Sequence, residues 1–232
     1  MTQRTIILHY HLFKNAGTSV DRVLQDSFPD RWVTREFSGQ SNTSQVEEWI
    51  AQSPGAVAFS SHTMMGPLPR VAGVDIVSLI MLRDPIARIR SAYRFEHRQA
   101  SDNFGAVLAR HTDFEGYVRV RLAMPADRQC RNFQTWRLAS LVPGPETELE
   151  RATKALEGLS IVGRVDAFGD ALGLLKVRLG GVFPEFHYDD VRMNVSGSHA
   201  TPPEEADALG QLLQENNRSD LALLRQVRAV GF

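Results

Sequence analysis

The segment Ile76–Leu82 constrains the fold of this chain more than any other stretch. It is an almost uninterrupted apolar run, which is typical of a strand buried on both faces of a parallel sheet. Three further apolar runs, Thr5–Leu12, Ala56–Ser61 and Leu159–Val165, alternate along the chain with helical patterns. This alternation predicts an α/β fold of three layers, with a central, mostly parallel sheet flanked by helices.

Several helices are predicted from capping residues and from the spacing of apolar residues. A helix is expected from about Thr18, where apolar residues recur at helical spacing, and another from Pro85 to about Arg98 with Asp84 as its N-cap. The segment 101–141 is typical of irregular helices. The spacing of apolar residues predicts an amphipathic helix from Phe168 to Leu179. Further helices are predicted after the capping-box pattern Thr201-Pro202-Pro203-Glu204 and after Ser219 as a cap.

Composition narrows the class of protein. The 232 residues suit a single domain, 1–232, and 43% hydrophobic with 23% charged residues indicates a globular chain. A net charge of -1 gives no reason to expect nucleic acid as a partner. The lone cysteine, Cys130, excludes an internal disulfide and a cysteine-based metal site. No signal pattern and no apolar run of membrane-spanning length are found, so a cytoplasmic location is expected.

Charge is distributed unevenly along the chain. The segment from Arg83 to Arg137 holds eleven arginines, no lysine and six acids, so it is net +5 and the remainder is net -6. We therefore expect an anionic ligand near the middle of the chain.

The first motif with chemical meaning is Lys14-Asn15-Ala16-Gly17-Thr18-Ser19, placed between a predicted strand and a predicted helix. Free N–H groups and the positive dipole end make a helix N-terminus attractive to phosphate. Gly17 lets the backbone approach an anion, and Lys14 adds a mobile charge. The order of residues differs from a Walker A loop, in which the lysine follows the last glycine. The plain alternative is a glycine-containing turn with a surface lysine.

The second motif runs from Arg83 to Tyr93. Arg83 follows the buried strand, at the edge where open α/β sheets bind ligands, and Ser91 lies about two turns into the next helix. Together they could clamp a second phosphate. The alternative is an Arg83–Asp84 pair beside a helix with a solvated basic face.

Taken together, the two motifs resemble the donor-binding motifs of sulfotransferases that use 3′-phosphoadenosine 5′-phosphosulfate (PAPS). The similarity is to the branch of heparan sulfate 2-O-sulfotransferases, other carbohydrate sulfotransferases and bacterial relatives. His11 to Ser19 resembles the 5′-phosphosulfate loop, and Arg83-Asp84-Pro85 through Ser91-Ala92-Tyr93 resembles the 3′-phosphate motif. Weaker similarities occur at 132–135, 162–164 and 194–196. A basic residue that often follows the last of these is replaced here by Gly197-Ser198-His199-Ala200.

The resemblance implies a P-loop-like fold and a donor site. In that site Lys14, Asn15, Ala16, Gly17, Thr18 and Ser19 would hold the 5′-phosphosulfate, and Arg83 and Ser91 the 3′-phosphate. The product would be 3′-phosphoadenosine 5′-phosphate, and no metal is expected.

A catalytic base is expected at His62, at the end of the second predicted strand, where the family places a histidine. Histidine suits the role because its unperturbed pKa of ~6.5 lies near working pH. His9 and His11 are rivals whose plainer role is packing against the sheet, and Glu96 is the reserve candidate. Cys130 and Trp136 are interpreted as core residues.

The predicted activity is therefore sulfuryl transfer from PAPS to a hydroxyl of a carbohydrate or small-molecule acceptor, with Lys14 and His62 as catalytic residues. Two alternatives stay open at this level. One is a small-molecule kinase of the P-loop type, and the other is a non-catalytic nucleotide-binding protein on the same fold.

Overall fold

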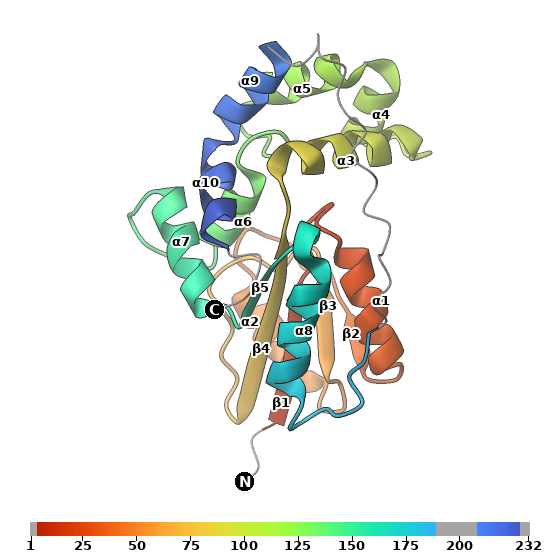
Figure 1. The fold of residues 1–232 in the computed structure, drawn as a ribbon, viewed down its shortest axis with the longest axis vertical. Helices are drawn as coiled ribbons and strands as arrows, with labels where there is room; N and C mark the ends of the chain where they lie inside the picture. The colour runs from red at the N-terminus through yellow and green to blue at the C-terminus, as the bar shows by residue number, and fades with distance from the viewer. Residues whose placement is uncertain (1–3, 189–207, 228–232) are drawn as a thin grey trace.

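The computed structural model of the protein describes residues 4–188 and 208–227. Its centre is a five-stranded sheet in the order β2-β3-β1-β4-β5, and each neighbouring pair of strands is parallel. Helices cover both faces, so the three-layer, P-loop-like α/β fold is confirmed (Figure 1). The strands are β1 (Arg4–Tyr10), β2 (Trp32–Thr34), β3 (Ala58–Ser61), β4 (Val74–Leu82) and β5 (Ile161–Arg164).

Helices make up most of the remaining structure. They are α1 (Gly17–Ser27), α2 (Thr43–Gln52), α3 (Pro85–Arg98), α4 (Phe104–His111), α5 (Phe114–Ala123), α6 (Phe133–Ala139), α7 (Glu148–Gly158), α8 (Phe168–Leu179), α9 (Ala208–Asn216) and α10 (Arg218–Gln226), with a short 3₁₀ turn, η1 (Val165–Ala167), before α8.

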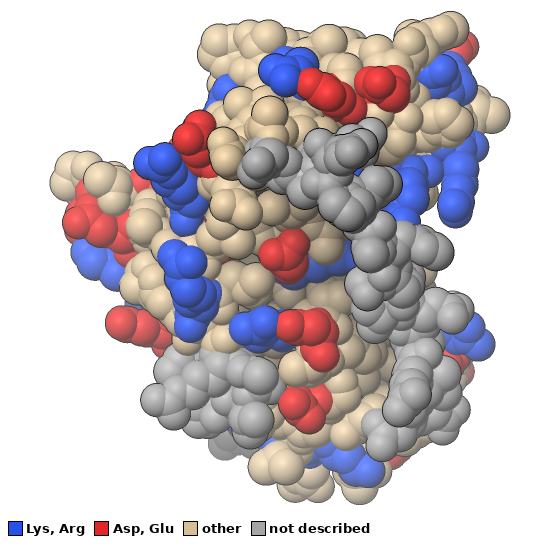
Figure 2. All heavy atoms as spheres, turned by 45° about the horizontal axis from the view of Figure 1, so that its top comes forward, with Lys and Arg blue, Asp and Glu red and all other residues tan. Residues whose placement is uncertain are grey.

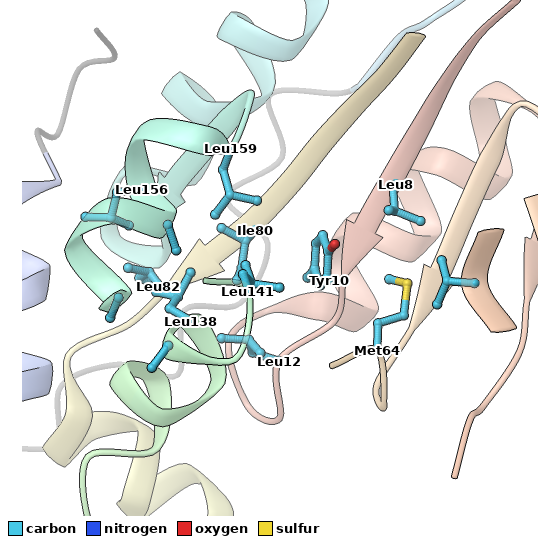
Figure 3. Close-up of a cluster of buried hydrophobic side chains, with 14 of the residues drawn as sticks. Leu8, Tyr10, Leu12, Met64, Ile80, Leu82, Leu138, Leu141, Leu156 and Leu159 are labelled. Atoms are coloured by element: carbon cyan, nitrogen blue, oxygen red, sulfur yellow. The ribbon is translucent and has the colours of Figure 1, made fainter. Parts of the chain in front are cut away.

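One face of the sheet packs against α2, α6, α7 and α10. Leu8 and Tyr10 of β1 and Ile80 and Leu82 of β4 point into this layer, and Leu156 of α7 meets them (Figure 3). All of these side chains are less than a tenth exposed. Burial of aliphatic side chains stabilises by ~1.5–3 kcal/mol each, so this layer contributes much of the stability.

The other face packs against α1 and α8. Because successive side chains of a strand point to opposite faces, Ile7 and His9 face this layer while their neighbours face the first. Val20 and Leu24 of α1 and Leu175 of α8 complete it. The alternation directs His9, and His11 beyond it, toward α1 instead of the leucine-rich layer.

A cap of helices lies beyond the carboxyl edge of the sheet, at the top of Figure 1, and consists of α3, α4, α5 and α9. Ile89, Tyr117 and Leu213 form its core together with Cys130. Cys130 is a buried free thiol, as the core interpretation predicts. No helix in the described ranges is long and apolar enough to cross a bilayer.

Most predicted elements are present. The strands begin or end up to two residues from the predicted limits, and α3 begins at Pro85 with Asp84 accepting from the Ala87 N–H at 2.8 Å. The segment 101–141 contains α4, α5 and α6. Three elements are not anticipated: the three-residue strand β2, and the helices α2 and α7.

The predicted cap of the last helix is wrong by two residues. Ser219 lies inside α10, whose N-cap is Asn217. The buried side chain of Asn217 donates to the carbonyl oxygens of Cys130 and Leu213, both at 2.9 Å, so tertiary bonds decide where this helix begins. The capping-box pattern at 201–204, and the segment 194–200, lie outside the described residues.

The strand order creates a crevice at the carboxyl edge of the sheet. After β1 the chain turns toward β2 and β3, whereas after β4 it turns toward β5 on the other side. Open α/β sheets bind ligands at such a topological switch point. The loop that leads into α1 and the residue Arg83 that follows β4 both lie there.

Candidate functional site

A pocket of about 270 Å³ opens at this crevice between the loop after β1, the end of β3, the residue after β4 and the side of α3. It gathers all but one of the predicted site residues. Those that line it are Lys14, Ala16, Gly17, Thr18, Ser19, His62, Arg83 and Ser91. Segments that lie far apart in the sequence are therefore brought together as the two motifs predict. The wall also includes His11, Phe13, Phe95, Val165 and Phe168.

The backbone of the loop is held in an unusual shape. Lys14 and Ala16 adopt the left-handed conformation, with φ of 63° and 60°, at ~1–2 kcal/mol each for residues other than glycine. In the described part of the chain, no acceptor meets the N–H groups of Ala16, Gly17 or Thr18. These strained turns therefore present three free donors and the positive end of α1 to the pocket.

Gly17 has a steric role that the sequence did not reveal. Its φ is not left-handed, but a Cβ at this position would overlap the imidazole of His11. The absence of a side chain therefore lets His11 lie directly against the first turn of α1.

Asn15 is the one predicted donor residue that the structure does not place in the pocket. Its side chain is buried, and its amide donates to the Met81 carbonyl and to Gln134 Oε1, both at 2.7 Å. Asn15 therefore ties the loop to β4 and α6, and its side chain holds the loop in shape.

Gln134 of α6 connects the two halves of the pocket and was not predicted as a site residue. Its Oε1 accepts from Asn15 and from the Arg83 N–H at 2.8 Å, while its Nε2 donates to the Arg83 carbonyl at 2.8 Å. Together with the Arg83 guanidinium, which donates to the Lys14 carbonyl at 3.1 Å, this buried amide sets the position of the β1 loop relative to the residue after β4. The sequence offered a weak signal here, the family-like segment 132–135.

The cationic side chains of the pocket form no ion pair with a carboxylate of the described residues. Burial and the nearby Arg83, Arg94 and Arg98 lower the pKa of Lys14, whose Nζ lies 4.3 Å from the centre of the Phe95 ring. Burial and Arg94 likewise lower the pKa of Arg83. Among the described residues none of these four cations forms an ion pair, so an anion bound here would relieve their mutual repulsion.

Most other arginines of the basic segment have structural partners. Arg121 bridges Glu96 and Asp127, and Arg128 pairs with Glu148. Figure 2 shows basic and acidic side chains side by side over much of one face. The net charge of this segment therefore overstates its free charge, and the unpaired part is concentrated beside Lys14.

His62 forms a dyad with a carboxylate at the rim of the pocket. Its Nδ1 donates to Glu36 Oε1 at 2.6 Å, and its backbone N–H donates to the same carboxylate. Partial burial opposes ionisation of Glu36, but hydrogen bonds from Thr63 and His62 outweigh it and hold the Glu36 pKa below its usual range. The His62 side chain is 52% exposed, so its Nε2 can contact a molecule bound at the rim. Glu36 lies in a loop and had no sequence signal.

A cluster of three residues, Asp21, His9 and His11, lies next to this dyad. Asp21 of α1 accepts from His9 Nδ1 at 2.8 Å through one oxygen and from His11 Nδ1 at 2.7 Å through the other. Burial opposes ionisation of Asp21, yet these bonds hold its pKa well below its usual range. Burial also lowers the pKa of His9. The interpretation of His9 and His11 as residues that merely pack against the sheet is therefore incomplete.

The three donor groups of this cluster lie within 4.8 Å of one another. Both carboxylate oxygens of Asp21 are already paired with ring nitrogens at hydrogen-bond distance, whereas Zn²⁺ would lie ~2.0–2.1 Å from each ligand. The cluster is thus accounted for as a hydrogen-bonded network. His11 alone of the two histidines reaches the pocket, and its ring centre lies 3.8 Å from that of His62.

Glu96, the reserve candidate for the base, is committed elsewhere. It accepts from Tyr117 Oη at 2.6 Å and pairs with Arg121 inside the helical cap. It does not line the pocket.

The fold and the pocket define an α/β protein with a cationic, donor-rich pocket at the carboxyl edge of its sheet. No protein-family model matches the chain. A protein of Archaeoglobus fulgidus, described as an uncharacterized protein, is 38% identical over 244 aligned residues, which cover 97% of this chain and 96% of the relative. The chain belongs to the same family as this archaeal protein.

Proposed function

We propose that this protein is a sulfotransferase that moves a sulfuryl group from PAPS to a hydroxyl of an acceptor. The observation that carries the proposal is the meeting of Lys14, Arg83 and the free N–H groups of α1 in one pocket whose cations form no ion pair in the described part of the chain. A ligand with anionic groups at two separated positions fits this arrangement.

The two sides of the pocket suit the two anionic ends of PAPS. The Lys14–Ser19 loop offers backbone N–H groups, two hydroxyls and an ammonium for the 5′-phosphosulfate. Arg83, whose guanidinium donates to the Lys14 carbonyl at 3.1 Å, and Ser91 also line the pocket and suit the 3′-phosphate. The apolar side chains of Val165 and Phe168 offer a surface for the purine. At about 270 Å³ the pocket is slightly smaller than the ~300–1,000 Å³ of ligand sites, so PAPS would fill it and extend beyond it.

The dyad at the rim supplies the acid–base chemistry of the proposal. Because Glu36 accepts from Nδ1 of His62, Nε2 is the nitrogen that takes the proton of the acceptor hydroxyl. The acceptor oxygen bonds to sulfur while the bond from sulfur to the bridging phosphate oxygen breaks. The electron pair of that bond stays on the phosphate oxygen, where Lys14 would stabilise the charge.

The decisive experiment is transfer of label from radioactive PAPS to a panel of hydroxyl-bearing carbohydrates and small molecules. Calorimetry with 3′-phosphoadenosine 5′-phosphate, AMP and ATP separates the alternatives. Tighter binding of the 3′-phosphorylated nucleotide than of AMP supports the proposal, and equal affinities would refute the roles of Arg83 and Ser91. Preference for ATP with phosphoryl transfer would favour a kinase. Binding of the bisphosphate without transfer to any acceptor would favour a non-catalytic nucleotide-binding protein.

A further inference from the structure

His11 occupies a position that the proposed chemistry does not use. Asp21 binds its Nδ1, the bare Cα of Gly17 lies against its ring, and the His62 ring packs on it at a tilt of 33° with centres 3.8 Å apart. Three residues, two of α1 and one that follows β3, thus fix the orientation of this imidazole. Only 7% of the residue is exposed, and that part lines the pocket.

The contacts decide which atom of the ring is available. Nδ1 is taken by Asp21, so Nε2 is the one polar atom of His11 that remains. Among the described residues no partner meets it, and it is not one of the fully buried unpaired atoms. Nε2 therefore opens into the pocket beside the free N–H groups of α1.

An anion in this pocket would lie beside Nε2. With the proton on Nδ1, a neutral His11 would present a lone pair to that anion and repel it, whereas the protonated ring would donate a charge-assisted hydrogen bond. Asp21 stands on the far side of the ring and would balance the added charge, since its depressed pKa keeps it ionised.

We propose that His11 is a second imidazole of the site, which takes up a proton when the donor binds and then holds the sulfuryl or 5′-phosphate oxygens through Nε2–H. Asp21 is its positioning residue. The proposal rests on the proposed function, because it takes PAPS as the ligand. No covalent bond is made or broken in this step; one proton moves from solvent to Nε2.

The charged and titratable groups around His11 come from every element packed against it. They are His9 of β1, Asp21 of α1, His62 after β3, Glu36 in the loop that holds His62, Lys14 in the loop before α1, and Arg83 after β4. A bound anion adds negative charge beside Nε2, and negative charge there favours the protonated ring. Uptake should therefore accompany binding.

The experiment is calorimetry of PAPS binding, without acceptor, at neutral pH in two buffers of different ionisation heat. On binding PAPS, wild type should take up ~1 proton per site more than His11→Gln takes up. The affinity of His11→Gln should be ~10- to 100-fold weaker, as for the loss of a hydrogen bond to a charged group. The 3′-phosphate titrates in the same range, so the comparison between the two proteins gives the contribution of His11.

Two variants complete the design. His9→Gln is the matched control, because His9 also bonds Asp21 but does not line the pocket, and it should keep the uptake. Asp21→Asn leaves His11 in place but removes its counter-charge, so the uptake should fall even though the ring is present. Urea unfolding of each variant verifies the fold.

Equal uptake in wild type and His11→Gln would overturn the inference while leaving the proposed function intact. If His11→Gln does not fold, Asp21→Asn decides by the same criterion. If neither variant folds, wild type decides alone with adenosine 5′-phosphosulfate, which lacks the 3′-phosphate that titrates in this range, since an affinity that does not change between pH 6 and 8 would contradict coupled uptake. Failure of wild type to bind PAPS at all would instead refute the proposed function, and this inference with it.

Discussion

Replacing His62 with alanine tests the chemistry of the pocket most directly. His62 stands at the rim with its Nδ1 bound to Glu36 at 2.6 Å and its side chain half exposed. In the described structure it makes no hydrogen bond to the Lys14–Ser19 loop or to Arg83, and Asp21 still holds the neighbouring His11 ring when His62 is replaced. The change should therefore affect the acceptor step and leave donor binding nearly as it is.

The size of the effect follows from the role of a positioned base, which contributes ~10²–10⁴-fold to rate. Turnover of His62→Ala should fall by this factor. Glu36→Gln keeps the shape of the partner but removes its charge, so it loses a charge-assisted bond of ~1.5–3 kcal/mol, or roughly ten- to a hundredfold in rate. Because Glu36 acts through His62, the double variant should be hardly slower than His62→Ala alone.

The assay is transfer of label from PAPS to a responsive acceptor, with donor affinity measured separately by calorimetry. His111→Ala is the control, since His111 is exposed at the end of α4. Near-normal turnover of His62→Ala, or a parallel loss of donor affinity, would refute the assignment. Because Glu96 is bound to Arg121 in the cap, the next candidate for the base would then be His11.

Four further outcomes can be checked. Arg83→Ala should weaken the binding of 3′-phosphoadenosine 5′-phosphate by ~10- to 100-fold in calorimetry and leave the affinity for AMP nearly unchanged. Equal losses of affinity for both nucleotides would contradict a 3′-phosphate contact. Gly17→Ala forces a methyl group onto His11 and should lower stability by ~1–3 kcal/mol in urea unfolding; an unchanged midpoint would disprove the steric role. Gln134→Ala leaves buried donors of Asn15 and Arg83 without their acceptor, so both stability and nucleotide affinity should fall, and loss of neither would count against its linking role. Because burial lowers the pKa of His9, the neutral ring contributes fully to stability above about pH 6.5, and this contribution is lost as the pH falls below that value. In urea unfolding, His9→Gln should therefore make the free energy of unfolding less dependent on pH in that window. The same pH dependence in wild type and variant would contradict this.

The features that could be predicted from the sequence depend on residues that are close together in the chain. The apolar run Ile76–Leu82 predicted a buried strand correctly because both faces of this strand meet helices. Asp84-Pro85 predicted the start of a helix correctly because capping involves only neighbouring residues. The pocket was foreseen for a topological reason, since residues that follow parallel strands meet at one edge of the sheet.

The unforeseen part depends on contacts between distant segments. β2 has only three residues and pairs with β3. It is therefore too short to show the alternation of apolar and polar residues that predicts a strand. The start of α10 moved from Ser219 to Asn217 because the Asn217 amide bonds carbonyls of Cys130 and Leu213. Glu36 and Gln134 carry no motif of their own and gain their roles only from the partners that the fold brings to them.

The sequence by itself determined the layers of this fold and the places of the two motifs that line the pocket, because strand periodicity, helix caps and turn residues act within a few positions of one another. The tertiary structure decided how those motifs work together. It turned Asn15 inward, packed His11 on Gly17, paired His62 with Glu36 and His11 with Asp21, and left Lys14 and Arg83 without an ion pair among the described residues. Each of these outcomes depends on distances between segments separated in the chain, which only packing sets.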